Sequence, residues 1–360
     1  MKRLFVLSMA FVFGAGVFAP LAAQGEATTL FLLINPGARQ GGMGEAGVAI
    51  ADDANAIYWN PAGLAFQYED EEVDTKGEAT IMHVNWLPQF GLNDLYYDYA
   101  GARYHIDGIG MVGGAIQFLN YGENIQTDTE GNEIGRFTSN EIAVTGSYAL
   151  KARENLGVGV NMKFVYSRLS PVQVDAERGK GVGSTFAVDL GALYHPGWAS
   201  KLSLGANISN IGPKITFIDR DQADPIPMNL RVGAAYRILD SEFNRLTFVY
   251  DLNRLMVPQD EELRDNSFMT YFYNTWTDGD GGDQFKRLSH SLGLEYWYTT
   301  LIALRAGYFY EDPNFGNREF WTFGGGVRIS FIGVDFSYIL GTVDDSPLSD
   351  TIRFSLLAKF

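Results

Sequence analysis

The 360-residue sequence contains no cysteine. The chain can therefore form no disulfide, and it offers no thiolate for a metal site or a lipid anchor. Positive charge is also scarce, because 27 Lys and Arg residues face 43 Asp and Glu residues and give a formal net charge of −16. A chain this acidic would repel the phosphates of nucleic acid, so no nucleic-acid partner is expected.

Residues that could carry catalysis or bind a metal are few and scattered. The four histidines, His83, His105, His195 and His290, show none of the spacings of a zinc site. The sequence also lacks the Gly-x-Ser-x-Gly elbow that presents a nucleophilic serine in many hydrolases. We therefore predict no catalytic residue, no metal site and no cofactor.

One glycine motif requires a closer look. Gly42-Met43-Gly44-Glu45-Ala46-Gly47 has the G-x-G-x-x-G spacing that binds dinucleotides in α/β proteins. No βαβ pattern follows it, and export would separate the chain from the nucleotide pool. We interpret the motif as a glycine-rich turn that opens a short helix over residues 45–51.

Residues 1–23 have the features of a secretory signal peptide. Lys2 and Arg3 form the charged start, an apolar stretch runs over residues 4–18, and a cleavage site at residues 21–23 predicts a mature chain that begins near Gln24. After this segment, no apolar run is long enough for a membrane-spanning helix.

Instead, apolar residues recur at every second position. Over residues 156–166 the apolar side chains fall on one face, while Gly157, Gly159, Asn161 and Lys163 fall on the other. In lipid, a chain without spanning helices can pair all its backbone groups only in a closed barrel. About fourteen such segments occur in residues 77–360, an even number as in bacterial outer-membrane barrels. The sequence thus predicts an all-β fold, a transmembrane antiparallel β-barrel embedded in outer-membrane lipid.

The segments define the expected strands and connections. Strands should start near residues 78, 95, 109, 138, 155, 184, 201, 228, 245, 289, 301, 320, 332 and 351. Short connections such as residues 105–108 alternate with long ones such as residues 120–137 and 254–288, as periplasmic turns alternate with extracellular loops. The last strand ends on Phe360, and a terminal aromatic residue is the usual signal for barrel insertion.

Residues 24–76 do not follow the alternating pattern. They contain the glycine-rich turn, a helix-like stretch and an Asn60-Pro61-Ala62 turn. Because they lie between a signal peptide and a barrel over residues 77–360, we expect them to form a plug inside the lumen.

The connection over residues 254–288 is the richest candidate for contact with a partner. It combines acidic residues with an apolar and aromatic group made up of Phe268, Met269, Tyr271, Phe272, Tyr273 and Trp276. Exposing so many aromatic side chains is unfavourable unless they pack on the barrel mouth or contact a partner. Both interpretations remain open, and they are compatible.

The amino-terminal motifs resemble those of a known superfamily. Residues 36–39, 42–49, 53–55 and 59–65 resemble the plug of the FadL-like outer-membrane barrels, whose architecture is a fourteen-strand barrel. The plug residues singled out by this resemblance are Gly42, Gly44, Gly47, Asn60, Pro61 and Ala62.

Towards the carboxy terminus, residues 294–298, 305–311, 334–338 and 351–356 resemble the PorV family of the type IX secretion system. This resemblance implies a non-enzymatic role, in which the barrel receives cargo with a type IX carboxy-terminal signal domain as it leaves the translocon barrel and delivers it to the surface sortase. The alternatives are a FadL-like channel for long-chain fatty acids or other hydrophobic molecules, and a purely structural barrel. The polar residues expected to face the lumen argue against an apolar conduit.

Overall fold

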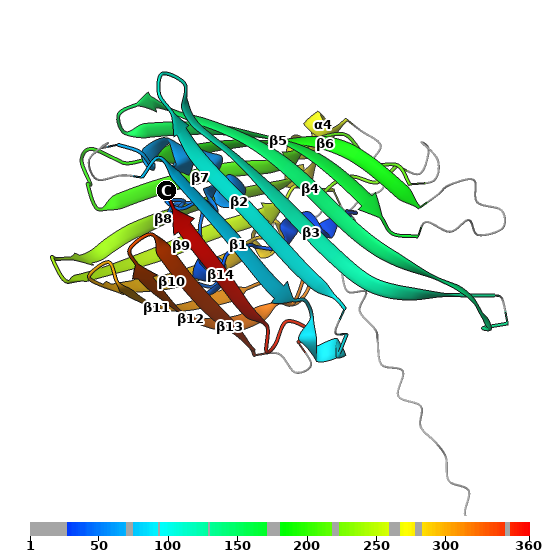
Figure 1. Ribbon diagram of the computed structural model, residues 1–360. Coiled ribbons are helices and arrows are strands. Elements are labelled where there is room, and N and C mark those ends of the chain that lie inside the picture. Colours follow the sequence, from blue (N-terminus) through cyan, green and yellow to red (C-terminus); the bar gives the residue numbers. More distant parts are fainter. Residues whose placement is uncertain are drawn as a thin grey trace, which may run out of the picture.

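The computed structural model describes residues 27–69, 75–92, 94–128, 130–170, 181–217, 223–258, 267–277, 283–342 and 346–360. The expected signal peptide, residues 1–23, lies outside these ranges. Fourteen antiparallel strands form a closed barrel (Figure 1). The strands are β1 (Gly77–Asn85), β2 (Tyr96–Ile106), β3 (Gly110–Thr127), β4 (Glu133–Arg153), β5 (Leu156–Arg168), β6 (Val182–Tyr194), β7 (Leu202–Ile211), β8 (Asn229–Asp240), β9 (Asn244–Leu255), β10 (Ser289–Tyr298), β11 (Ile302–Tyr310), β12 (Glu319–Ile329), β13 (Ile332–Gly341) and β14 (Ile352–Lys359).

Each strand pairs with its neighbours in sequence, and the ring closes where β1 pairs with β14, from Glu78↔Lys359 to His83↔Phe354. The barrel class and the strand number agree with the sequence-based prediction. The expected strand starts also lie close to the observed ones, except that β4 begins at Glu133 rather than near residue 138.

The two faces of the wall have opposite chemistry, as the alternating pattern predicts. On β5 the outward Met162 side chain is 70% exposed, whereas Asn161 and Lys163 are buried in the lumen. On β14 the outward Phe354 is 60% exposed, whereas Arg353 is buried. The barrel therefore presents an apolar outer surface to lipid and a polar lining to whatever lies inside it.

The long loop expected over residues 120–137 is not a loop. β3 and β4 remain paired beyond the wall, from Glu123↔Thr138 to Thr127↔Glu133, and form a hairpin that projects from the barrel (Figure 1). The tight turn at its tip is held by Asp128, whose side chain accepts hydrogen bonds from the backbone N–H groups of Glu130 and Asn132. The glycines and acidic residues that suggest a loop thus lie within or beside a paired ribbon.

The other long connection agrees with its expected bounds, because β9 ends at Leu255 and β10 begins at Ser289. It contains two short helices, α4 (Phe268–Thr277) and α5 (Asp283–Lys286). Elsewhere, a 3-10 turn, η3 (Pro88–Phe90), lies in the connection between β1 and β2. No helix in the described part of the chain is both long and apolar enough to cross a membrane.

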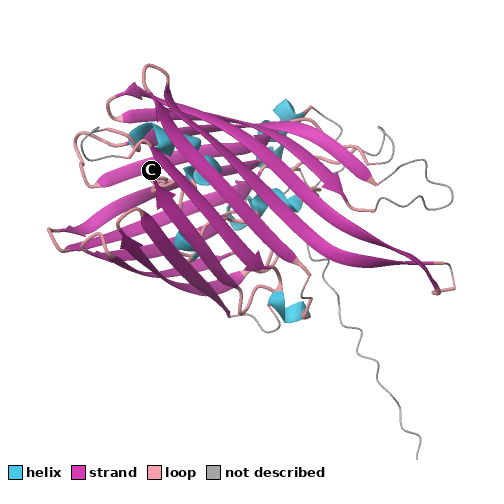
Figure 2. Ribbon diagram, viewed as in Figure 1, coloured by secondary structure: helices cyan, strands magenta, loops and turns pink. Residues whose placement is uncertain are grey.

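Residues 27–69, called the N-terminal segment below, contain four short helical turns inside the ring of strands (Figure 2). These are η1 (Leu30–Leu33), α1 (Ala38–Gly41), α2 (Ala56–Trp59) and η2 (Pro61–Phe66). The helix expected over residues 45–51 is wrong. Gly44 and Glu45 both have positive φ angles, 65° and 61°, and two successive left-handed residues cannot continue a right-handed helix.

The N-terminal segment spans the lumen from end to end. The backbone N–H of Thr28 donates to the carbonyl of Pro225 among the long connections, whereas Glu69 accepts a 2.8 Å hydrogen bond from Lys151 next to the short turn between β4 and β5. Short turns face the periplasm in bacterial barrels. The end with the long connections, called the mouth below, therefore faces the cell exterior.

Candidate functional site: the segment inside the barrel and the mouth

Polar side chains of the strands bind the backbone of the N-terminal segment. The N–H groups of Ala38, Gly44, Gly47, Val48 and Ala54 donate, at 2.7–2.9 Å, to side-chain oxygens of Ser355, Thr322, Asp251, Asp251 and Glu78, respectively. Asn161 and Asn207 donate to the carbonyls of Ile57 and Trp59 at 2.7 Å and 3.2 Å. Irregular buried backbone needs such partners, because no sheet or helix satisfies it.

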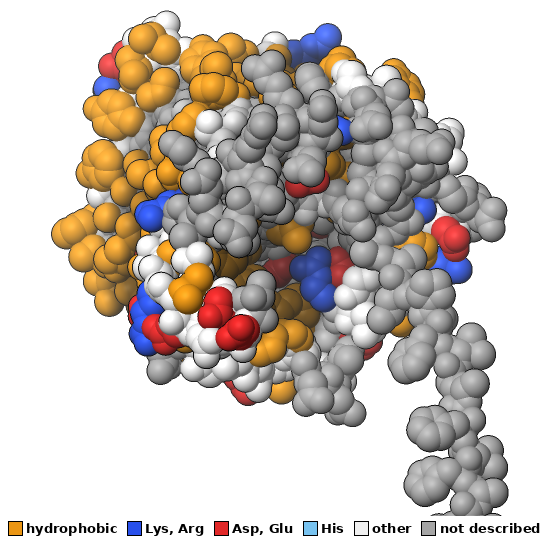
Figure 3. All heavy atoms as spheres, turned by 90° about the vertical axis from the view of Figure 1, so that its right-hand side faces the viewer, with side chains coloured by type: hydrophobic (Ala, Val, Ile, Leu, Met, Phe, Trp, Pro, Cys, Tyr) orange, Lys and Arg blue, Asp and Glu red, His pale blue; other side chains and the backbone are white. Residues whose placement is uncertain are grey.

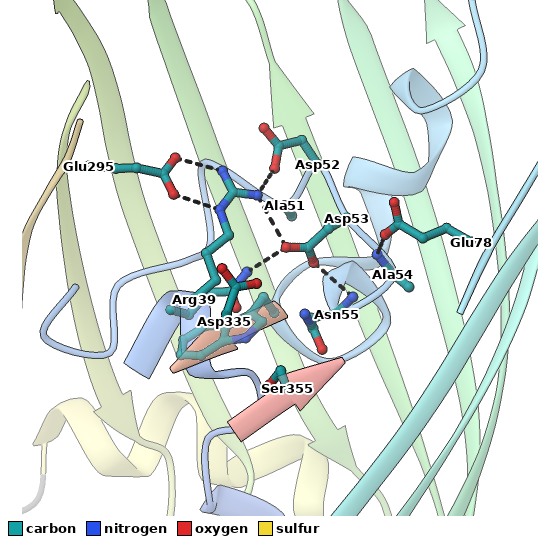
Figure 4. Close-up of polar contacts among 12 residues, drawn as sticks. Arg39, Ala51, Asp52, Asp53, Ala54, Asn55, Glu78, Glu295, Asp335 and Ser355 are labelled. Atoms are coloured by element: carbon teal, nitrogen blue, oxygen red, sulfur yellow. Dashed lines mark hydrogen bonds and ion pairs between the residues drawn. The ribbon is translucent and has the colours of Figure 1, made fainter. Parts of the chain in front are cut away.

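Arg39, on α1, is the centre of the charged contacts (Figure 4). Its guanidinium forms a bidentate pair with Glu295 of β10, with both N–O distances 2.8 Å. It also contacts Asp53 at 3.1 Å, and it pairs with Asp52. Burial alone would lower the pKa of Arg39, but the surrounding carboxylates of Asp52, Glu295 and Asp53 outweigh burial and raise the pKa well above its ordinary value. Arg39 therefore stays charged and pairs with the carboxylates of Asp52, Asp53 and Glu295 at the same time.

The ion pairs continue along the inner wall. Glu295 also contacts Arg305 of β11 at 2.7 Å, Arg305 contacts Asp335 of β13 at 2.7 Å, and Asp335 contacts Arg328 of β12 at 2.6 Å. The chain of alternating charges thus joins the N-terminal segment to four consecutive strands. Breaking one buried link would leave an uncompensated charge, so the whole set is expected to hold one arrangement.

A second charged link joins the N-terminal segment to β14. Glu45 accepts a 2.6 Å hydrogen bond from Arg353 of β14. It also accepts one of 2.6 Å from Asn35. Burial alone would raise the pKa of Glu45, but Arg353, Arg318 and the Asn35 hydrogen bond together outweigh burial, and the pKa lies below its ordinary value. The carboxylate is therefore ionised at neutral pH and ties the segment to the closing strand.

The predicted glycines of the plug motif lie where the segment touches the wall or folds on itself. A side chain on Gly44, at a φ of 65°, would come within 2.5 Å of the Leu292 carbonyl oxygen. On the facing strand, a side chain on Gly307 would come within 1.9 Å of the Gly44 nitrogen. A side chain on Gly47 would meet the Trp59 ring at 2.6 Å. These positions exclude larger residues because the backbones approach so closely.

Asn60, Pro61 and Ala62 lie against a different part of the wall. The Asn60 amide donates at 2.9 Å both to the Val48 carbonyl and to the Ala192 carbonyl of β6, while its oxygen accepts from the Ala62 N–H at 3.1 Å. Pro61 opens η2, where its fixed φ suits a helical start. The structure therefore places the six predicted plug residues against three parts of the wall. Gly42 and Gly44 face β10–β12, Gly47 donates to Asp251 of β9, and the Asn-Pro-Ala turn faces β5 and β6.

A mainly apolar cavity of about 450 Å³ lies between the N-terminal segment and the mouth. Its walls include Phe31 and Ile34 of the segment and Trp86 and Leu119 of the barrel. The charged side chains in its lining are Glu45, Glu311 and Arg318. Figure 3 looks into this end of the molecule, where a hollow contains basic and acidic side chains next to each other.

The candidate partner-binding residues on α4 divide into two sets. Tyr271 is 2% exposed and packs with Met228 and Met256 at the mouth. Trp276 lies under the Arg254 guanidinium, 4.0 Å from its ring centroid. Met269, Phe272 and Tyr273 point to solvent, with Tyr273 73% exposed; the Phe268 side chain lies outside the described set. Packing on the mouth therefore accounts for Tyr271, while contact with a partner remains a prediction for the exposed side chains.

Sequence reasoning missed one exposed aromatic residue of the same connection. Phe285 on α5 is 77% exposed. It follows a run of glycine and aspartate, which hides it from a search for aromatic clusters, although its position within residues 254–288 was a usable signal. Within the described residues, no group of three or more His, Asp or Glu side chains is placed to hold a metal ion.

Comparison with solved structures defines the class. The chain resembles the Pseudomonas putida toluene transporter TodX (TM-score 0.56, 14% identity, 90% of this chain and 96% of that one). It also resembles the Ralstonia pickettii toluene transporter TbuX (0.52, 13%, 91% and 98%) and a Pseudomonas aeruginosa FadL homologue (0.50, 13%, 90% and 98%). The protein is therefore an outer-membrane β-barrel with a FadL-like fold.

The family is shown by a sequence model. The model for the type IX secretion system protein PorV matches residues 23–262, more than half of the chain. The chain belongs to the PorV family of type IX secretion system proteins. The carboxy-terminal motifs of residues 294–298 and 351–356 lie beyond the matched range. A search of the curated proteins found no match.

Proposed function

We propose that this protein receives cargo carrying a type IX carboxy-terminal signal domain as the cargo leaves the translocon barrel, and delivers it to the sortase at the cell surface. Membership of the PorV family is the observation that carries this proposal. It identifies the secretion system, and therefore the kind of partner, but cargo, translocon and sortase contacts are our inference. The proposed role is adaptor-like and needs no catalytic residue.

The contacts of the N-terminal segment support the proposal that the protein binds its cargo outside the lumen. Within this proposal, residues 24–76 act as a plug in the barrel of residues 77–360, and residues 1–23 are removed as a signal peptide. The ion pairs of Arg39 with Glu295 and of Glu45 with Arg353 join the segment to β10 and to β14. Buried, mutually paired charges resist displacement, because any movement would expose an unpaired charge in the lumen. A sealed barrel can hand cargo over only at its outer surface.

The mouth offers two surfaces for such contacts. Neither edge of the projecting hairpin pairs with another described strand, because β2 stops pairing with β3 at Asn120 and β5 stops pairing with β4 at Asn140. Free strand edges readily accept a strand from another protein. At the same end of the barrel, Met269 and Tyr273 expose apolar area that burial against a partner would remove from water.

A deletion strain provides the first test. Loss of the protein should leave cargo with a type IX signal domain unsecreted or unattached, and purification of the native protein should recover such cargo. Intact secretion in the deletion strain, with no signal-domain protein recovered, would contradict the proposal.

A surface variant makes the test specific. Met269→Ser with Tyr273→Ser should reduce cargo recovery several-fold, since interface aromatic residues often contribute about 2 kcal/mol or more, while the barrel stays folded. Phe243→Ser is the matched control, because Phe243 is an exposed aromatic residue in the short turn between β8 and β9, at the opposite end. Equal recovery by both variants would remove α4 from the partner surface.

A hydrophobic channel is the second candidate function, and the apolar mouth cavity favours it. The solved structures of similar fold include two that are described as toluene transporters. A channel should bind long-chain fatty acid or a similar apolar molecule stoichiometrically, and its deletion should slow uptake but leave secretion intact. The adaptor proposal expects the opposite result in both assays.

A further inference from the structure

The periplasmic end of the lumen contains a basic chamber, although the chain as a whole carries a net charge of −16. Two cavities of about 420 and 490 Å³ share Arg39, Asp52, Arg245, Trp297 and Lys359 in their walls, and together they form what we call the vestibule. The walls of the first cavity contain six basic side chains, those of Arg39, Arg103, Lys201, Arg237, Arg245 and Lys359, and two acidic ones, those of Asp52 and Glu295.

Within the described ranges, carboxylates neutralise only part of the charge of Lys201, Arg237, Arg245 and Lys359. Arg237 and Arg245 share one carboxylate, that of Asp240, at 2.9 Å and 3.5 Å. Lys359 lies 3.9 Å from Glu78, a distance at the limit of an ion pair. Lys201 has no acidic partner in the described part of the chain. Arg39 is committed to the buried network, so the excess positive charge lies towards the opening.

These side chains also face the opening. The Arg245 and Lys359 side chains are 51% and 53% exposed, and Lys201 is exposed in the short turn before β7. Charge at the walls of a low-dielectric chamber is screened less than charge on an open surface, so the field is focused on anything that enters. The vestibule therefore attracts anions in a protein that otherwise repels them.

The basic residues form two groups on opposite sides of the ring. Lys359 on β14, next to β1, forms the first, whereas the second consists of Lys201, Arg237 and Arg245 from the turn before β7 and from β8 and β9. In the closed barrel β8 lies across the ring from β1. An extended molecule with several negative charges can contact both groups.

We propose that the vestibule binds an acidic peptide segment of a periplasmic partner protein, which crosses the opening and pairs with both groups of basic residues. Basic residues on opposite sides of the ring favour an extended chain with several negative charges over a single lipid headgroup. The acidity of the whole chain argues against nucleic acid. This inference concerns the opposite end from the cargo surface and does not depend on the proposed function.

The test uses the full-length protein in detergent and a fluorescein-labelled peptide that alternates Glu with Gly. Fluorescence anisotropy should show binding that weakens as salt rises, and a peptide with Gln in place of Glu should not bind. Lys201→Gln with Arg245→Gln should weaken binding about tenfold, as expected for the loss of two focused charges. Arg136→Gln with Lys286→Gln, one exposed arginine and one exposed lysine at the mouth, is the matched control and should bind like the original protein.

Two further measurements separate the alternatives. Lys359→Gln, on the other side of the ring, should also weaken peptide binding, and a lack of effect would contradict the crossing arrangement. Inorganic phosphate should compete only at concentrations far above that of the peptide. Competition by phosphate at comparable concentration, or equal binding of the Gln peptide, would overturn the proposal. Resistance of the folded barrel to SDS at room temperature checks that each variant is intact.

Discussion

Replacing Arg39 with Met tests how the N-terminal segment is held. The change removes the guanidinium that Glu295 contacts through two 2.8 Å bonds and Asp53 contacts at 3.1 Å, and it leaves both carboxylates buried. Removing one partner of a buried ion pair typically costs about 3–5 kcal/mol. Glu295 keeps its 2.7 Å contact with Arg305, so we expect the lower end, about 3 kcal/mol.

Hydrogen exchange measures this cost at the segment itself. The N–H groups of Gly41 and Gly42 donate to the carbonyls of Gly37 and Ala38, both at 3.0 Å, and exchange only when the segment opens. A loss of about 3 kcal/mol should speed their exchange roughly 100-fold in Arg39→Met. Amides in the strand centres should exchange as slowly as before, because the barrel wall keeps its own hydrogen bonds.

A double variant identifies the cause. Adding Glu295→Met to Arg39→Met removes the orphaned carboxylate, and Arg305 retains Asp335 at 2.7 Å. Exchange of the segment should then be slower than in Arg39→Met alone, since apolar replacement of a buried pair is often close to neutral. Unchanged exchange in Arg39→Met, or a double variant that opens faster still, would refute the reasoning.

Three other variants test separate contacts. Gly307→Val places methyl groups where the Gly44 amide lies, so the segment should detach and ion conductance through the barrel in planar bilayers should rise. Because Arg353, Arg318 and the Asn35 hydrogen bond together set the folded pKa of Glu45 below 4.5, their stabilisation is present at neutral pH and is lost as the pH falls through the folded pKa. Hydrogen exchange of the segment should therefore accelerate in acid, relative to intrinsic rates, in the original protein but less so in Glu45→Gln. Deleting Phe360 removes two backbone hydrogen bonds to β1, worth about 2 kcal/mol together, and should lower the heat resistance of the barrel on SDS gels.

Most of the wall could be predicted because lipid imposes a local rule. Each outward position must be apolar, and each inward position is free to be polar. The alternation along β5 therefore predicts that Met162 faces lipid and that Asn161 faces the lumen. The rule ends where the strand leaves the membrane. Over residues 121–139 both faces of the ribbon meet water, the alternation weakens, and the sequence resembles a loop even though its strands stay paired.

The charged contacts inside the barrel could be predicted only in part. Glu295 and Arg305 stand directly opposite each other across the turn between β10 and β11, so their pairing follows from the hairpin register. The contact of Glu295 with Arg39 spans 256 residues and depends on how the whole ring closes. Within a single sequence, nothing distinguishes Arg39 from any other basic residue near a glycine turn.

The path of the N-terminal segment has a consequence for assembly. Its side-chain partners come from strands early and late in the chain, and the contact between Ala38 and Ser355 spans 317 residues. The segment is made before any strand, yet its last hydrogen-bond partners appear only when β14 is in place. An incomplete ring offers it no complete set of partners. The full set of hydrogen bonds to the segment can therefore form only on a finished barrel, because those to Ser355 and Arg353 require the final strand.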